Sequence, residues 1–261
     1  MDIPRLLIVF STLAFLGGVA HAMVALRAGK WQESRWHLLP MAVGFIFQSA
    51  FLYLRGQQHG RCPLTNLFEA FIFIGWCIVL LYFLVGATYR LSLLGVFTAP
   101  MVALLQITSL LSSIDQAVPA PREKINPWLE FHAAVALIAY AAFALACITG
   151  VMFLLQDRLL KKHRINALFH QLPPIHDLSK AIVRMVFVGV VLLSLAMTAS
   201  FRINKPITSG KMLVAWIVLA LYIVIALLMW RRSLSARQTA WLAVLGFTVP
   251  ILSMWIVTAK L

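Results

Sequence analysis

The sequence predicts an all-α fold, a bundle of about eight helices that forms a polytopic integral membrane protein. Of the 261 residues, 62% are hydrophobic and 11% are charged, whereas a soluble domain carries about 25% charged residues. The hydrophobic residues gather in runs of about 20, the helix length that crosses the hydrocarbon core. No soluble-looking segment separates these runs, so we expect one membrane domain over residues 1–261.

The predicted spans follow one another with short polar connections. Pro100 and Pro250 fall inside the fourth and eighth spans, where each removes a backbone donor and is expected to bend its helix. The fifth span is rich in alanine from Ala133 to Ala146, and small residues let helices approach closely in lipid, so we expect it at the centre of the bundle. The spans are Ile3–Leu26, His37–Leu54, Leu67–Ala87, Leu91–Leu111, Leu129–Leu155, Ala181–Phe201, Met212–Trp230 and Thr239–Ala259.

The first span has features of both a signal peptide and a retained helix. It contains Ala20-His21-Ala22, which imitates a cleavage site. However, the run is long for a signal peptide, and Arg5 precedes it while Arg27 and Lys30 follow. This charge bias favours a retained first helix with its N-terminus outside.

The distribution of basic residues predicts the topology of the whole chain. With eight spans both termini share one side, and the opposite side holds the larger part of the 22 Lys and Arg residues. Because cytoplasmic loops are enriched in Lys and Arg, both termini are expected outside. The net charge of +14 therefore indicates topology and contact with anionic lipid, and no nucleic acid partner is expected.

The most informative stretch opens the fifth span and reads Trp128-Leu129-Glu130-Phe131-His132. Tryptophan favours the membrane–water boundary, so His132 is expected at or just below the headgroups on the outer side. An imidazole in that position can act as a metal ligand or a proton carrier, or it can be an interfacial polar residue bonded to water or a carbonyl. The residues alone leave these alternatives open.

Glu69 lies inside the third span and has two interpretations. Thr65 or Asn66 can cap the helix, and a carboxylate near a helix N-terminus is stabilised there without any function. Alternatively, Glu69 shares one helix face with Phe73 and Trp76, and presents an acid and two aromatic rings to the bundle interior. An acid inside a membrane is costly and marks a candidate functional site.

Other classes of site have little support in the sequence. No nucleotide-binding loop, catalytic triad, zinc motif or carboxylate pair is visible, so an enzymatic activity is not predicted. Cys62, Cys77 and Cys147 form no Cys-x-x-Cys pair, which argues against thioredoxin-like chemistry and covalent haem attachment. The connection Gln156–Lys180 is basic in its first half, and we interpret it as a helix extension at anionic lipid or as a docking site for a cytoplasmic partner.

Three segments together resemble the CcsA-type cytochrome c assembly proteins. Gly60–Trp76 resembles that family's signature of Gly, Pro, Asn, Glu and Trp, and Leu94–Pro100 resembles its next helix. Trp128–His132 with Tyr140 resembles the helix that carries the family's first external haem-ligand histidine. The resemblance covers most of the chain and is specific in the combination of its segments.

The sequence also departs from the full pattern of this family. Full members carry a tryptophan-rich motif between the spans corresponding to six and seven, whereas Arg202–Gly210 contains no tryptophan. No histidine matches the family's second external ligand. The chain is therefore similar to the short, eight-span branch that includes the HemX-like and YpjD-like proteins.

The resemblance implies a haem-handling accessory of cytochrome c biogenesis in the bacterial inner membrane, working with an assembly partner in the membrane. It implies a transient b-type haem at the outer face, with His132 as the iron ligand, tryptophan walls and a basic contact for the propionates. The alternative is a HemX-type regulator or scaffold that binds a tetrapyrrole-synthesis enzyme without ligating haem. The residues expected at a haem site are His132, Trp128, Glu69, Trp76, Arg61, Lys211 and His59.

Overall fold

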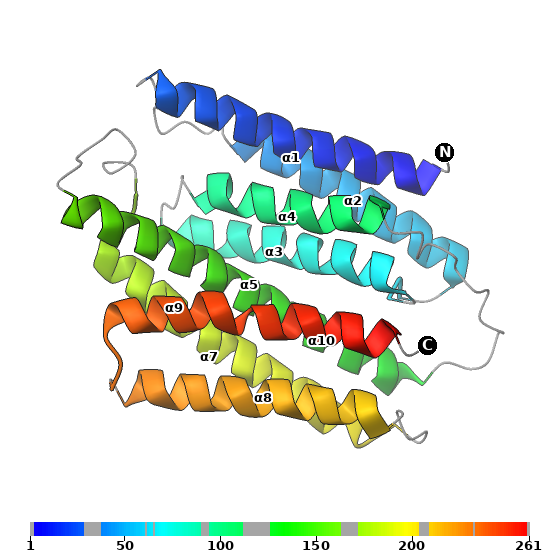
Figure 1. Cartoon of the computed structure of the whole chain (residues 1–261). Helices are drawn as coiled ribbons and strands as arrows, with labels where there is room; N and C mark the ends of the chain where they lie inside the picture. Colours follow the sequence, from blue (N-terminus) through cyan, green and yellow to red (C-terminus); the bar gives the residue numbers. More distant parts are fainter. Residues whose placement is uncertain are drawn as a thin grey trace. The chain divides into compact units, whose positions relative to one another are not determined.

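The structure is a computed structural model, and every element that it describes is a helix (Figure 1). Seven of the described helices are long enough and apolar enough to cross a membrane. This confirms the predicted all-α membrane fold. The described residues are 3–28, 38–60, 62–64, 66–89, 94–111, 126–162, 172–203, 209–231 and 233–259.

The described helices follow the predicted spans in order. Their bounds are α1 (Ile3–Arg27), α2 (Leu38–His59), α3 (Leu67–Tyr89), α4 (Leu94–Leu111), α5 (Pro127–Lys161), α7 (Ile175–Ser200), α8 (Ser209–Trp230), α9 (Ala236–Gly246) and α10 (Thr248–Ala259).

Helices α5 and α7 are longer than the spans predicted for them. Helix α5 continues past Leu155 to Lys161, and α7 begins at Ile175, ahead of the predicted start at Ala181. Hydropathy marks where a span meets the membrane surface, whereas helical hydrogen bonds continue into the polar residues beyond it. The predicted connection Gln156–Lys180 is therefore wrong at both ends, and its interpretation as a helix extension is confirmed as far as Lys161.

The eighth predicted span is formed by two successive helices. Helices α9 and α10 are interrupted at Phe247. Pro250 has no N–H and cannot donate to the carbonyl of Gly246, four residues earlier, which accounts for the interruption. Pro100 has a milder effect, because α4 continues through it.

The chain divides into two compact units. Unit 1 comprises Met1–Val118 and Leu159–Pro173, and unit 2 comprises Pro119–Arg158 and Pro174–Leu261. Helices α1–α4 therefore lie in unit 1, and α7–α10 with most of α5 lie in unit 2. The expectation of a single domain stays a prediction.

Unit 1 has a layer of polar side chains next to an apolar cluster inside its helix bundle. The polar layer joins α1, α2 and α4, because Ser11 donates to the carbonyl of Gly44 at 2.9 Å and accepts from the Gln106 amide at 3.0 Å. Thr12 Oγ1 also lies 2.8 Å from Gln106 Oε1. Side-chain hydrogen bonds of this kind hold membrane helices together. The adjoining apolar cluster is fully buried and contains Ile8, Phe51, Phe68 and Ile72.

Gln48 lies on the inner face of α2 and is fully buried, and its amide oxygen and nitrogen have no hydrogen-bond partner among the described residues. A Cβ atom at Gly75 would come within 3.1 Å of the Gln48 amide nitrogen and 3.3 Å of Val102. Glycine at position 75 therefore provides the room in which the amide lies.

Unit 2 is organised around the alanine-rich middle of α5. The most apolar window of this helix is 83% buried. Phe143 of α5 stacks on Tyr222 of α8 with ring centroids 3.5 Å apart, and it fills the space beside Gly189 of α7. At Gly150 the helix passes so near α9 that an added Cβ would lie 3.0 Å from the carbonyl oxygen of Ala240. Within unit 2 the helix contacts α7, α8 and α9, and its central position in the whole bundle stays a prediction.

Candidate functional site

The start of α5 is fixed by Asn126. Its side-chain oxygen accepts the N–H of Trp128 at 3.0 Å, and its carbonyl accepts the N–H of Leu129 at 2.9 Å. These bonds satisfy donors that a helix N-terminus otherwise leaves free. Trp128 and His132 are four residues apart and therefore share one side of the helix.

The His132 ring is held by the last turns of α7. The residue is half-buried, and its Nδ1 lies 2.6 Å from the carbonyl oxygen of Ala196. A carbonyl oxygen can only accept, so Nδ1 carries the proton of this bond. In the neutral ring the lone pair then belongs to Nε2. Metal-binding histidines are oriented by the same kind of bond from the nitrogen that does not face the metal.

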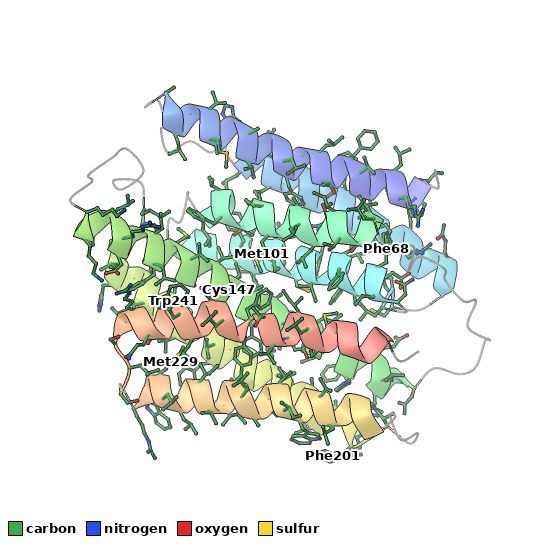
Figure 2. All side chains as sticks on the ribbon, viewed as in Figure 1. Phe68, Met101, Cys147, Phe201, Met229 and Trp241 are labelled. Atoms are coloured by element: carbon green, nitrogen blue, oxygen red, sulfur yellow. The ribbon has the colours of Figure 1, made fainter. Side chains whose placement is uncertain are left out.

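Aromatic rings and a cation lie at the end of unit 2 where α5 begins and α7 ends. Trp128 is 47% exposed and meets Phe131 edge to face, with centroids 6.4 Å apart. Phe201, labelled in Figure 2, lies 6.1 Å from the ring of Trp216. The guanidinium carbon of Arg202 lies 5.9 Å from the centroid of the Trp128 ring.

Arg202 was not among the residues predicted for the site, because its partner Trp128 is far away in the sequence. The end of α7 positions it: the N–H groups of Phe201, Arg202 and Ile203 each donate to a carbonyl three residues earlier, at 3.3, 3.1 and 3.1 Å. Only its place just after a predicted span end could have pointed to it.

Glu69 lies in unit 1, where internal contacts account for it. Asn66 Oδ1 accepts the backbone N–H of Glu69 at 2.8 Å, which confirms the predicted cap. The carboxylate is fully buried, and its Oε1 lies 2.9 Å from Nε of Arg55 on α2. This ion pair joins the end of α2 to the start of α3, and its cation was not predicted.

Trp76 also lies in unit 1, at the contact between α2 and α3. Its indole N–H donates to Ser49 Oγ at 2.9 Å. The ring stacks on Phe45 with centroids 5.3 Å apart, and on Phe73 with centroids 5.9 Å apart. The stack agrees with the expectation that Phe73 and Trp76 share one helix face, and the assignment of Trp76 to a haem site stays a prediction.

The remaining predicted site residues have no described side chain. Arg61 lies outside the described residues. His59 and Lys211 belong to α2 and α8, but their side chains are outside the described part of the structure. Their assignment to a haem site stays a prediction.

The residues around His132 fit the chemistry of a haem ligand site. Within the described ranges, no three His, Cys, Asp or Glu side chains gather as a site for a metal ion. A haem iron, however, takes only one or two ligands from the protein, because the porphyrin supplies the others. One oriented imidazole, that of His132, meets that requirement.

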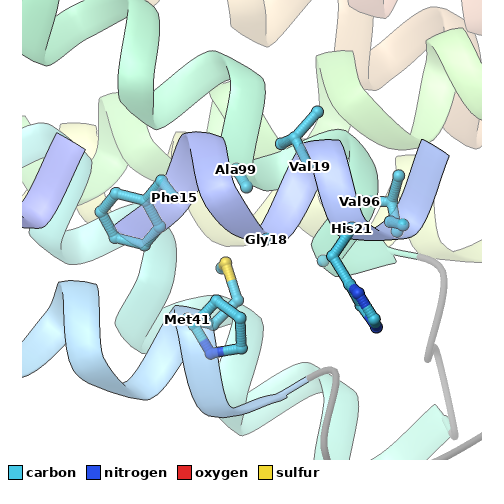
Figure 3. A pocket seen from close by; sticks show the side chains of 10 residues that line it. Phe15, Gly18, Val19, His21, Met41, Val96 and Ala99 are labelled. Atoms are coloured by element: carbon cyan, nitrogen blue, oxygen red, sulfur yellow. The ribbon is translucent and has the colours of Figure 1, made fainter. Parts of the chain in front are cut away.

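The cavity in unit 1 is too small to hold a haem. Figure 3 shows Phe15, Gly18 and His21 of α1 facing Met41 of α2, with Ala99 of α4 completing the wall. The cavity volume is about 20 Å³, room for about one water molecule. A tetrapyrrole is far too large for this space.

Comparisons with known proteins agree with the resemblance seen in the sequence. The chain is 27% identical over 189 residues to Protein HemX of Brevibacillus brevis, which covers 70% of this chain and 69% of that protein. It is 34% identical over 110 residues to Cytochrome c biogenesis protein CcsA of Chlorella vulgaris, which covers 41% of this chain and 35% of that protein. It is 30% identical over 122 residues to Cytochrome c biogenesis protein CcsA of Nostoc punctiforme, and this match covers 45% of this chain and 34% of that protein. The chain thus spans about a third of the length of these CcsA proteins.

A family model described as Cytochrome C assembly protein matches residues 64–199, about half of the chain. The matched region includes Asn66, Glu69, Trp76, Trp128 and His132. The chain belongs to the cytochrome c assembly protein family.

Proposed function

We propose that this chain is an integral membrane accessory of cytochrome c biogenesis that binds and presents haem at the outer membrane face through His132. Membership of the cytochrome c assembly family and the seven apolar helices support a membrane role in cytochrome c biogenesis or haem handling. Haem is the cargo in this proposal, and the bacterial inner membrane is its proposed location.

The observation that carries the proposal is the contact between His132 Nδ1 and the Ala196 carbonyl. It sets the ring orientation and leaves Nε2 as the nitrogen with a lone pair, the form in which imidazole ligates iron. Trp128, one turn earlier, offers an apolar ring to a planar ligand. A single imidazole ligand favours exchange of the haem over permanent storage.

Absorption spectroscopy of protein purified from haem-replete cells tests the proposal. We expect a Soret band in the wild type that is lost in His132→Ala and shifted in His132→Cys, which offers iron a different ligand. His176→Ala is the matched control, because His176 is an exposed histidine at the start of α7. A Soret band of equal strength in His132→Ala contradicts the proposal, as does a haem-free wild type whose deletion leaves cytochrome c levels unchanged.

A second candidate function is that of a HemX-type regulator or scaffold of tetrapyrrole biosynthesis. The observation that favours it is the similarity to Protein HemX, which extends over most of both chains. Its contact surface would be the exposed basic end of α5, where Arg158, Lys161 and Lys162 lie. Anionic lipid is the competing partner for these charges.

The two functions respond differently to the same pair of variants. If the chain acts as a regulator, replacing Lys161 and Lys162 by glutamate changes the cellular level of a tetrapyrrole-synthesis enzyme, whereas His132→Ala does not. If it acts as a haem accessory, His132→Ala lowers the amount of holocytochrome c and the lysine variant leaves it unchanged.

A further inference from the structure

Arg202 and Trp128 form a cation–aromatic pair near the start of α5, the helix that carries His132. On α5, Trp128 is one turn ahead of His132, a rise of about 6 Å along the helix. On α7, Ala196 contacts the histidine and Arg202 follows just after the helix end. One turn of α5 ahead of the imidazole there is thus a tryptophan ring with a guanidinium carbon 5.9 Å from its centroid.

The structure restrains Arg202 while its charge stays exposed. Its backbone is held in the tight final turn by the bond from its N–H to the Ala199 carbonyl at 3.1 Å. Its side chain lies within the range of a cation–π contact with Trp128. Arginine can stack on an aromatic ring and still direct its planar fork of N–H groups at a carboxylate. The exposed guanidinium is thus oriented before any ligand arrives.

Glu130 is the nearest acid in the sequence of this segment, but it does not share the face that carries Trp128 and His132. Residues two apart on a helix do not face the same way. The basic Arg202 therefore accompanies two side chains that offer no negative charge, a combination that suits an apolar, planar ligand with an acidic edge.

We propose that Arg202 is a specificity-determining residue whose guanidinium, supported by Trp128, binds a carboxylate of the tetrapyrrole that His132 ligates. The proposal rests on the proposed haem function and gives it a ligand class, a tetrapyrrole with free carboxylates. A phosphate of a membrane lipid offers a similar anion, and the experiment below separates the two sources.

Titrations with haem and with haem dimethyl ester, followed by the Soret band in detergent, test this proposal. The ester keeps the iron and the ring but has no carboxylate charge. We expect Arg202→Gln to weaken the binding of haem by about ten- to a hundredfold, the size of a lost charge-assisted contact. It should leave ester binding unchanged, and Arg202→Lys should restore only part of the haem affinity, because lysine lacks the planar fork.

Arg237→Gln is the matched control, because this exposed arginine pairs with Asp157 at 3.8 Å near the far end of α5 and should not affect haem or ester. Equal loss of affinity for haem and ester in Arg202→Gln would overturn the proposal, since the residue would then act only on packing. Unchanged haem binding, with reduced binding to phosphatidylglycerol vesicles, overturns it in favour of lipid phosphate. If the wild type binds neither compound, the proposed haem function fails together with the Arg202 proposal. Failure of the Arg202 proposal alone is recognised because the wild type still binds both compounds.

Discussion

Replacing Glu69 by alanine is expected to lower the free energy of unfolding by about 3–5 kcal/mol, because it removes one partner of a buried ion pair between α2 and α3. The carboxylate is fully buried and Arg55 is 13% exposed, so little water reaches the pair. The Oε1–Nε distance of 2.9 Å is that of a charge-assisted hydrogen bond. The isosteric Glu69→Gln keeps a hydrogen-bond acceptor and should lose less, about 1.5–3 kcal/mol.

Unfolding in mixed micelles, followed by tryptophan fluorescence, measures these losses. A double-mutant cycle with Arg55→Met isolates the interaction between the two side chains. Arg55→Met combined with Glu69→Leu should come within about 1 kcal/mol of the wild type, since an apolar pair can replace a buried ion pair. The reasoning is refuted if Glu69→Ala costs less than about 1 kcal/mol or if the two single effects simply add. Loss of haem binding in a stably folded Glu69→Gln would instead support the predicted assignment of Glu69 to the haem site.

Two further predictions concern packing and buried polarity, each checked by thermal melting in detergent. Gly189→Ala should lower the free energy of unfolding by about 1–3 kcal/mol, because the added methyl group would overlap the ring of Phe143. In the control Gly17→Ala the added methyl group meets no atom within 4 Å, so this change should be neutral or stabilising. Equal changes of melting temperature in the two variants would contradict the packing at Gly189. Gln48→Leu should stabilise unit 1 by about 1 kcal/mol, because it removes an amide with no partner. Gln106→Leu, which removes the hydrogen bonds that link α4 to Ser11 and Thr12 of α1, should destabilise unit 1. A loss of stability in Gln48→Leu would contradict the assignment of Gln48 as an amide without a partner among the described residues.

Features that depend on local sequence were predicted well. Hydropathy located the spans because about 20 apolar residues are required to cross the membrane. The Asn66 cap was predictable because a capping bond involves only residues at the start of the same helix. Pro250 was expected to bend the eighth span, and the structure instead interrupts that span at Phe247, three residues ahead of the proline.

Contacts between distant segments were not predicted. Glu69 could be recognised as an unusual acid, but its pairing with Arg55 depends on how α2 packs on α3. His132 was recognised as a candidate ligand, yet the acceptor of its ring N–H is a carbonyl on α7, and main-chain groups leave no mark in a sequence. Arg202 was missed for the same reason, since its role depends on the antiparallel approach of α5 and α7.

The acceptor that orients His132 is part of the main chain, and this has a consequence for how the site responds to mutation. Any substitution at position 196 other than proline keeps the same carbonyl in α7, so the tautomer of the imidazole does not depend on the identity of that residue. It depends on the axial offset between α5 and α7. A slide of one residue along α7 would withdraw the oxygen and release the ring. The nitrogen that carries the lone pair is therefore selected by helix register and does not depend on the side chain at position 196.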